Sequence, residues 1–410
     1  MASTLLSKPG HSRRILVLTS TFPRWISDTE PRFVFDLSKK LVEAGFLVDV
    51  IAPHAGGAKL HEEVAGINIY RYRYCPDRFQ TLAYNGGILA NLKKNKFNYL
   101  LVPFFLLFQS LAIIRRINFQ EYDLIHAHWL IPQAFICMLV MRLTGSRDTP
   151  VLCTSHGADL YSLNSPVLRW IKRWTASNCS HLCVVSQTMK KDCLYLVNDE
   201  SSISVLPMGV DLKNLFVPVA GVERLNHRLI FVGRFVEKKG IEVLIDAMSK
   251  VRLTMPSVEL ILVGDGPLRK NLEDKVRASD LEGNIKFYGS MANRELPELY
   301  SSANIAVIPS IVDTHGDREG LGLVTIEALG CGCAVVASAL GPIQELVEHG
   351  VSGLLFAPGN ADALAECLIR LLKEPVLARS LARTGREQVQ EPFDWQRVAD
   401  NYTRLINRFC

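Results

Sequence analysis

Two glutamates eight positions apart, Glu319 and Glu327, stand at the ends of the segment EGLGLVTIE. Gly320 and Gly322 allow a tight turn with close backbone approach to a ligand, and the N–H groups that open the following helix favour an anion. Glu327, within this helix, is placed to accept hydrogen bonds from the vicinal hydroxyls of a ribose, whereas Glu319 faces whatever is attached beyond the phosphates. Backbone contacts to this ligand are expected at Gly322, Leu323 and Val324.

A cationic turn precedes this segment, where VGR is followed by KKG. A strand-like run ends at Val232 and the chain turns at Gly233; in a doubly wound sheet the ligand crevice lies at the carboxyl ends of the strands. Arg234 and Lys239 therefore lie at the crevice mouth, where a guanidinium can bind a diphosphate bidentately and an ammonium acts as a point charge. The alternative for both is an ordinary surface position. We expect Lys238 to face solvent.

His156 follows another strand-like run, in the segment TSHGAD. We expect its ring to project into the same crevice, where it would hydrogen-bond sugar hydroxyls or the reacting centre; the alternative is a core histidine that bonds the backbone. Asp159 is equally compatible with a helix cap and with an acceptor contact. His126 and His128 share one strand face, as a metal pair would, but no third ligand is near in sequence. For these two we expect structural or acceptor-side roles and no metal.

Near-continuous apolar runs recur along the chain, separated by longer segments with helical spacing. Such runs are typical of strands covered on both faces of a parallel sheet, and their alternation with helices indicates an α/β fold. In the first half the expected strands are Ile15–Thr19, Val48–Ala52, Ile67–Tyr72, Leu124–Ala127, Val151–Ser155, His181–Val185 and Ile203–Leu206. In the second half they are Leu229–Val232, Glu259–Val263, Ile285–Tyr288, Ile305–Ile308, Ala334–Ala337 and Leu354–Phe356. Amphipathic helices are expected at Ile241–Val251, Leu268–Ala278 and Ala363–Leu372.

The turn-rich stretch Pro207–Asp211 divides these strands into two sets, each sufficient for one open sheet. We therefore expect two Rossmann-like, doubly wound domains, residues 1–210 and 211–390, that face each other across a cleft. The tail, residues 391–410, is expected to be a helix with an apolar stripe that some surface must cover. The stripe consists of Trp395, Val398, Tyr402, Leu405 and Ile406.

The composition of the 410 residues is that of a folded protein, with 48% hydrophobic and 21% charged residues. The formal net charge is only +5 and the basic residues are dispersed, which argues against a nucleic-acid partner. No G-x-G-x-x-G follows the first strand of either half, which argues against a nicotinamide enzyme. The segment Met1–Arg14 lacks the apolar run of a secretory signal, and the ten cysteines form no zinc-binding pattern, so we expect reduced thiols in the cytoplasm.

One segment, Phe97–Ile114, is strongly apolar and is followed by Arg115 and Arg116. Its composition favours a buried helix of the first domain. The alternative is a peripheral membrane contact through residues 97–116, with the arginines near anionic headgroups on the inner face of a membrane. A spanning helix fits least, because a span needs about 20 apolar residues and this run is interrupted by two amides, a proline and a serine.

The motifs together resemble glycosyltransferase family 4, whose members are retaining enzymes of the GT-B fold. The resemblance is densest from Arg228 to Pro358, where VGR…KKG, GDG, EGLGLVTIEALGCGCAVVAS, GPIQELV and GLLFAPGN follow one another. The first half adds SHGAD, VVS and, at the hinge, LPMGVD. Each motif alone is weak, whereas the set in this order and spacing is specific.

The resemblance implies roles for individual residues. Arg234 and Lys239 match the cations that bind the donor diphosphate, and Glu327 matches the carboxylate that holds the ribose. Glu319 matches the carboxylate that faces the donor sugar, and His156 matches the histidine near that sugar. The tail resembles the C-terminal helices that return to the first domain, which is then the acceptor domain, while the second is the donor domain.

The implied activity is retaining hexosyl transfer from a UDP- or GDP-sugar to a hydroxyl of a glycan or lipid-linked acceptor, with no metal cofactor. The rivals are a sugar-nucleotide epimerase or a phosphorylase of the same fold, and a non-catalytic nucleotide-sugar-binding protein. One departure concerns the acceptor side, since family members often carry a Gly-Gly loop after the first strand. Here that stretch, residues 21–28, has no glycine, so Arg24 or Arg32 is expected to supply contacts instead.

Overall fold

The first sheet grows outward from β1 (Arg14–Leu18), a strand whose apolar side chains are buried. β1 pairs in parallel with β2 and β5, and the sheet order is β3-β4-β2-β1-β5-β6-β7-β8. The remaining strands are β2 (Leu47–Pro53), β3 (His61–Val64), β4 (Ile67–Tyr72), β5 (Leu124–His128), β6 (Val151–Ser155), β7 (His181–Val184) and β8 (Ile203–Val205). The structure, a computed structural model, describes residues 12–25, 28, 30–146 and 148–410.

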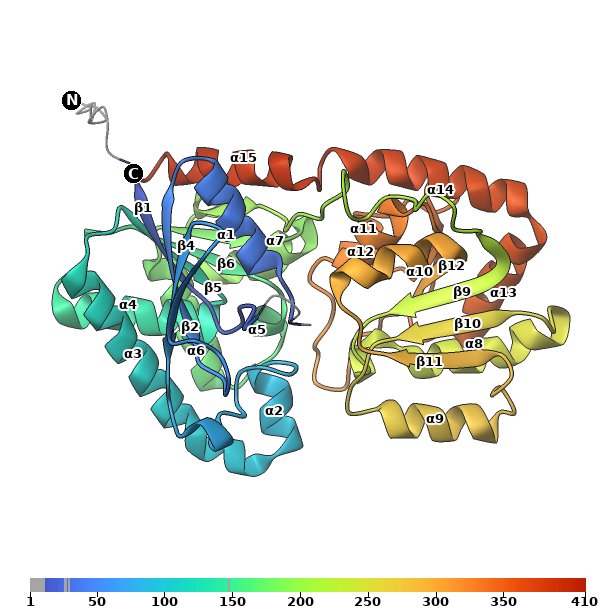
Figure 1. Cartoon of the computed structure of the whole chain (residues 1–410), viewed down its shortest axis with the longest axis horizontal. Helices are drawn as coiled ribbons and strands as arrows, with labels where there is room; N and C mark the ends of the chain where they lie inside the picture. Colours follow the sequence, from blue (N-terminus) through green and yellow to red (C-terminus); the bar gives the residue numbers. More distant parts are fainter. Residues whose placement is uncertain (1–11, 26–27, 29, 147) are drawn as a thin grey trace.

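β9 (Leu225–Val232) is central in the second sheet, where the strands pair in parallel in the order β11-β10-β9-β12-β13-β14. Its other strands are β10 (Glu259–Val263), β11 (Ile285–Gly289), β12 (Ala303–Ile308), β13 (Ala334–Ser338) and β14 (Leu354–Phe356). The two sheets belong to separate lobes that lie side by side (Figure 1). The expectation of two Rossmann-like α/β domains is thereby confirmed.

Helices connect most of the successive strands and pack on the sheets (Figure 1). In the first lobe they are α1 (Phe33–Glu43), α2 (Ile88–Lys94), α3 (Val102–Phe119), α4 (Phe135–Thr144), α5 (Ala158–Tyr161), α6 (Pro166–Asn178) and α7 (Gln187–Cys193). In the second they are α8 (Ile241–Thr254), α9 (Arg269–Ala278), α10 (Leu296–Ser302), α11 (Leu323–Gly330), α12 (Gly341–Gln344), α13 (Ala361–Lys373) and α14 (Pro375–Gln390). The last helix, α15 (Trp395–Ile406), lies on the first lobe against α1.

β3 is a strand that the apolar pattern does not predict. Its sequence is HEEV, and its side chains are exposed or half-buried. It pairs antiparallel with β4 at the edge of the first sheet, where one face and one edge meet water. Edge strands tolerate such charged side chains, so hydrophobicity gives little signal there.

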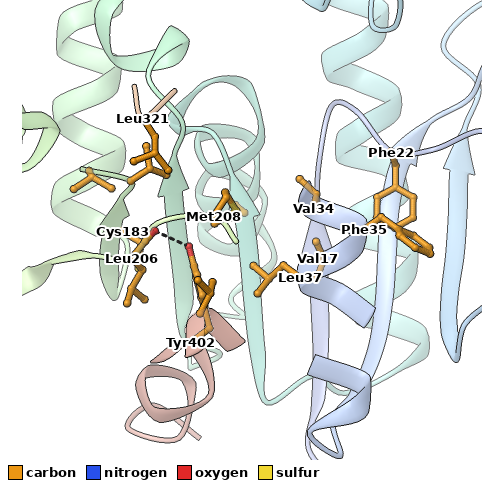
Figure 2. Close-up of a cluster of buried hydrophobic side chains, with 14 of the residues drawn as sticks. Val17, Phe22, Val34, Phe35, Leu37, Cys183, Leu206, Met208, Leu321 and Tyr402 are labelled. Carbon is orange, nitrogen blue, oxygen red and sulfur yellow. Dashed lines mark hydrogen bonds between the residues drawn. The ribbon is translucent and has the colours of Figure 1, made fainter. Parts of the chain in front are cut away.

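The chain passes between the lobes twice, and the two passages lie together. The amide of Val210, on the way out, donates to the carbonyl of Phe393, on the way back, at 2.8 Å. α15 then buries all five side chains of its apolar stripe. Figure 2 shows Tyr402 reaching into the core beside Leu206, whose carbonyl accepts a hydrogen bond from the Tyr402 hydroxyl at 3.3 Å.

The segment Lys96–Phe119 forms a 3-10 turn (Lys96–Leu101) followed by α3. This stretch is long and apolar enough to cross a membrane, with a mean hydropathy of 1.9. Only 22% of its most apolar 18 residues are buried against the rest of the protein. In α3 the buried side chains are Phe105, Gln109 and Ile113, which form one stripe at four-residue spacing. The favoured interpretation of a buried helix is therefore wrong, because the rest of the helix surface is open.

Candidate active site

The turn between β12 and α11 forms the floor of the site. Gly322 has φ of 87° and ψ of 58°, a left-handed conformation that suits glycine, and it begins α11. Among the described side chains none caps this helix, so the first amide groups, at Leu323 and Val324, point out of its N-terminus without a side-chain partner. An N-terminus of this kind favours a negatively charged group.

Lys239 and Glu319 meet beside this helix end. Lys239 ends the 3-10 turn Glu237–Lys239, and its Nζ lies 2.8 Å from Oε1 of Glu319. The two side chains are only 15% and 10% exposed. Burial by itself would raise the pKa of Glu319, but the charges of Lys239 and Lys238 outweigh it and lower the pKa. Glu319 is therefore an ionised carboxylate within the protein interior.

Lys238 does not face solvent, contrary to expectation. Its side chain is 21% exposed, and Nζ lies 3.1 Å from a carboxylate oxygen of Asp317. The expectation failed because the loop that carries Asp317 lies far away in sequence and folds over the 3-10 turn. The ion pair ties this loop, which continues into Glu319, to the end of β9.

Glu327 occupies the second turn of α11 and is 9% exposed. The hydroxyl of the buried Tyr300 donates to its Oε2 at 3.4 Å. Burial raises the pKa of Glu327 to about 7, although the Tyr300 hydrogen bond and the charge of Lys239 act in the opposite direction. Lys239 thus lies near enough to influence both carboxylates, and a nearly neutral pKa leaves Glu327 ready to ionise when it gains donors.

Arg234 crosses the space between the lobes. Its Nη1 donates to the carbonyl oxygen of Gly86, which belongs to the first lobe. Burial lowers the pKa of Arg234, and the charge of Glu30 partly offsets this effect. The stem of Lys239 lies near the turn before Arg234, since a Cβ on Gly233 would lie 3.6 Å from Cε of Lys239. No carboxylate in the described ranges forms an ion pair with Arg234, so its charge is available to an anion.

His156 follows β6 on the first lobe and is half-buried where this lobe meets Gly320 of the second. Its Nε2 is 2.9 Å from Nδ1 of His128, and its ring contacts those of Phe33 and Trp129, with centroids 4.8 and 5.0 Å away. Burial, together with the nearby His126, lowers the pKa of His156 to about 3. The imidazole is therefore neutral and can exchange hydrogen bonds without carrying charge.

Asp159 organises the loop that carries His156. One carboxylate oxygen accepts from the amide of His156 at 3.2 Å and from the hydroxyl of Ser155 at 2.9 Å. The other accepts from the amide of Leu130 at 2.7 Å. Asp159 lies within α5, whose N-terminus is capped by no described side chain, so the helix-cap alternative is wrong. Its carboxylate is 3% exposed and holds the loop that carries His156.

The two lobes touch where His156 faces the Glu319 turn. A Cβ on Gly320 would lie 2.5 Å from the carbonyl oxygen of His156, so only glycine permits this approach. His126 lies deeper and bonds Thr154 at 2.8 Å. Within the described part of the chain, no group of three or more potential ligands is arranged to hold a metal ion.

Sequence reasoning missed the first-lobe loop opposite Arg234. The loop contains Gly86 and Gly87, and its Asn85 amide donates to Oε1 of Glu30 at 2.5 Å. The same carboxylate accepts from the Thr21 hydroxyl at 3.0 Å, which joins this loop to the one after β1. A glycine pair, absent after the first strand, is thus present in a later loop that contacts both Glu30 and Arg234. The tripeptide NGG at residues 85–87, directly before α2, is a turn signal visible in the sequence.

Arg24 and Arg32 were expected to replace that glycine pair. Arg24 instead forms two hydrogen bonds with Asp28, at 2.7 and 2.8 Å, and stacks over the ring of Tyr84. Arg32 lines a groove of about 470 Å³ whose walls come from α1, the hinge near Asp211 and residues 292–294 of the second lobe. Arg24 is thus engaged in the architecture of the first lobe, whereas Arg32 lies 31% exposed in the groove.

Two family models cover most of the chain. Residues 31–214 match the model described as Glycosyltransferase Family 4, and residues 224–388 match Glycosyl transferases group 1. The chain belongs to glycosyltransferase family 4. It is accordingly a glycosyltransferase of the GT-B fold, as the resemblance implied.

Glycosyltransferases of known activity are similar to this chain in sequence, and solved structures are similar to it in fold. N-acetyl-alpha-D-glucosaminyl L-malate synthase of Bacillus anthracis is 26% identical, over 70% of this chain and 74% of its own length. The GDP-mannose-dependent phosphatidylinositol monomannoside mannosyltransferase of Mycobacterium tuberculosis is 27% identical, over 68% and 74%. Sucrose-phosphate synthase of Thermosynechococcus elongatus has a TM-score of 0.77 at 25% identity, covering 97% and 98%. HepE of Anabaena with UDP and glucose has a TM-score of 0.73 at 21% identity, covering 97% and 100%, and shows the fold alone.

Proposed function

We propose that this chain is a retaining hexosyltransferase that moves a sugar from a UDP- or GDP-sugar to a hydroxyl of a glycan or lipid-linked acceptor. One observation carries the proposal: near the N-terminus of α11, Lys239 pairs with the buried Glu319 and its charge also reaches the buried Glu327. Arg234 follows the same strand as Lys239 and has no carboxylate partner among the described residues. This arrangement offers positive charge and free amides to a diphosphate and a carboxylate to a ribose.

In this proposal the diphosphate lies between Arg234, Lys239 and the amides of Leu323 and Val324. Negative charge grows on the β-phosphate as its bond to the sugar breaks, and donors that are already oriented toward that charge stabilise the transition state. The two cations supply the compensation that a divalent metal supplies in other transferases. We therefore propose that no metal is required.

The remaining groups orient the donor. Glu327 accepts hydrogen bonds from the two ribose hydroxyls, and Glu319 accepts from hydroxyls of the donor sugar. His156 reaches the same sugar from the first lobe and, being neutral, donates or accepts one hydrogen bond there. Closure of the lobes excludes water from the reacting carbon, which favours the acceptor over hydrolysis.

Retention of the anomeric configuration is proposed from the family, whose members are retaining enzymes. The acceptor hydroxyl attacks the face from which the phosphate departs, and the departing phosphate oxygen takes the hydroxyl proton. The relatives include an enzyme named for GDP-mannose, and one structural neighbour was solved with UDP, so donors with both bases are candidates.

The test is a donor screen by thermal unfolding followed by product analysis. A true donor at a hundredfold excess over its Kd adds about 2.7 kcal/mol of apparent stability, and UDP-, GDP- and ADP-sugars are compared in parallel. Glu327→Gln should lose most of this gain, while Glu345→Gln, on the same lobe but away from the site, should keep it. No stabilisation by any nucleotide sugar would contradict the proposal.

Product analysis then separates the rivals. A transferase consumes the donor rapidly only when an acceptor is present, and NMR of the product reports the anomeric configuration. An epimerase converts the donor alone, a phosphorylase requires inorganic phosphate, and a binding protein holds the donor without converting it. Each of these three outcomes would replace the transferase assignment.

A further inference from the structure

α3 and the 3-10 turn before it present an apolar surface that no described part of the chain covers. We call it the α3 face. Phe97 is 78% exposed, Leu100 69% and Phe104 52%. The face consists of Phe97, Tyr99, Leu100, Phe104, Leu107, Phe108 and Leu111. Contiguous apolar surface of this extent on a folded protein marks a binding surface rather than ordinary exposure.

The opposite side of α3 fixes the face rigidly to the first lobe. Phe105 is 1% exposed and packs edge-on against the rings of Tyr72 and Tyr74, with centroids 5.4 and 5.2 Å away. Arg116 joins the end of the helix to the buried Asp49 at 2.7 Å. The exposed residues therefore cannot turn inward without unfolding this anchor.

The charge around the α3 face has one sign. Residues 78–120 contain no aspartate or glutamate and six lysines or arginines. Arg116 is paired, but Lys93, Lys94, Lys96 and Arg115 are exposed, and none of these four forms an ion pair in the described structure. The lysines stand at the beginning of the face and Arg115 stands near its end.

We propose that the α3 face docks on a bilayer whose surface carries anionic lipids. The aromatic and leucine side chains enter the boundary of headgroups and acyl chains, and the cations at both ends bind headgroup phosphates. A second copy of the chain fits less well, because symmetric pairing of two such faces would bring like charges together. A helix that lies in the plane of the bilayer surface keeps the buried stripe of Phe105, Gln109 and Ile113 packed on the first lobe. A membrane-spanning helix would have to lose these contacts.

The face is connected to the candidate active site through one short helix. α2 begins directly after Gly86 and Gly87, the loop that contacts Arg234, and it ends with Lys93 and Lys94. In Figure 1 α2 lies on the side of the first lobe that faces the second, next to α3. Docking would therefore hold the first-lobe edge of the cleft near the bilayer. The consequence for a lipid-linked acceptor rests on the proposed function, whereas the docking itself does not.

Vesicle flotation of the full chain tests the proposal. We expect binding to vesicles of phosphatidylcholine mixed with phosphatidylglycerol and much weaker binding to phosphatidylcholine alone. Leu100→Ser/Phe104→Ser/Leu107→Ser should lose binding to both. Lys93→Gln/Lys94→Gln/Lys96→Gln should lower affinity for the anionic vesicles roughly tenfold or more, with a smaller effect on neutral ones.

The matched control is Leu253→Ser/Val376→Ser, which changes side chains of the second lobe that are 80% and 71% exposed and should leave binding unchanged. Circular dichroism and donor-induced stabilisation verify that each variant folds. The proposal fails if the unaltered chain ignores anionic vesicles, if the control loses as much binding as the serine variant, or if light scattering shows a dimer that the serine variant dissociates. Vesicle binding without transferase activity would overturn the proposed function and leave the docking intact.

Discussion

Arg234 and Lys239 carry their charges in different surroundings. We therefore expect the loss of Arg234 to affect catalysis alone and the loss of Lys239 to affect both catalysis and folding stability. Lys239 neutralises a buried carboxylate at 2.8 Å, so its removal would leave Glu319 unpaired in the interior. Among the described residues, the Arg234 guanidinium bonds only the carbonyl oxygen of Gly86, which water can replace. The sequence predicts both cations from their position after a strand, but it does not indicate that one is also structural.

We expect Arg234→Ala to lower kcat about 10²-fold, because stabilisation of the departing phosphate worth roughly 3 kcal/mol is lost. The unfolding midpoint should change little. Lys239→Ala should instead reduce both activity and stability. The free energy of unfolding should fall by roughly 3 kcal/mol, because the buried charge of Glu319 is left unpaired. Steady-state kinetics and urea denaturation measure the two effects. An Arg234→Ala enzyme with full turnover would rule out its assigned role.

Glu327 should make donor binding depend on pH. Its pKa of about 7 in the free protein means that it is half-protonated near neutrality, whereas ribose hydroxyls bind best to the ionised form. Binding therefore releases a proton, and donor affinity should fall as pH decreases through 7, roughly tenfold between pH 8 and 6. Titration calorimetry in buffers of different ionisation enthalpy measures the released proton. A pH-independent affinity, or one unchanged in Glu327→Gln, would contradict this expectation.

At the scale of elements, the pattern of apolar residues predicts the buried strands closely and fails where burial is one-sided. The ranges of β4, β6, β10 and β14 coincide with those expected. The burial of α3 was predicted wrongly because its sequence is apolar on every side. Such a helix has no periodic pattern that indicates which face packs on the protein. The loop at Gly86 lies 148 residues from Arg234 in the chain, so no local motif could join them.

α15 is an element whose amphipathic pattern predicts its packing, and we expect the first lobe to depend on it. Trp395 is 7% exposed, and a Cβ on Gly209 would lie 2.6 Å from its ring, so the two fit closely. Trp395→Ala should lower the free energy of unfolding by about 3–5 kcal/mol. Arg397→Ala, on the exposed side of the same helix, should have little effect. Differential scanning calorimetry compares the two, and equal midpoints would contradict the packing argument.

At the scale of the molecule, polar contacts join the second lobe to α7 of the first lobe. Glu345 of the second lobe accepts from the amides of Gln187 and Thr188, at 2.8 and 2.6 Å, and so caps α7 of the first lobe. Arg318 pairs with Asp192 of the first lobe at 2.5 Å. These bonds hold a closed arrangement, in which His156 and Gly320 touch.

We expect Glu345→Gln to favour an open arrangement, because charge-assisted bonds to two amides and a hydroxyl are weakened. Turnover should fall about tenfold while donor affinity, which depends on the second lobe, is retained. The fraction of donor lost to hydrolysis should rise. Small-angle scattering would show a larger radius of gyration, and an unchanged radius with unchanged turnover would show that the contact does not control closure.

The return of α15 to the first lobe also governs how the protein can be made. A ribosome completes β1 to β8 early, yet the slot beside Leu206 that Tyr402 fills stays empty until α15 is translated. The lobe that is synthesised first is thus the last to be finished, and the whole second lobe must emerge in between. A fragment ending at the Val210 passage would expose that slot to water, so co-expression of a peptide spanning α15 should rescue its solubility.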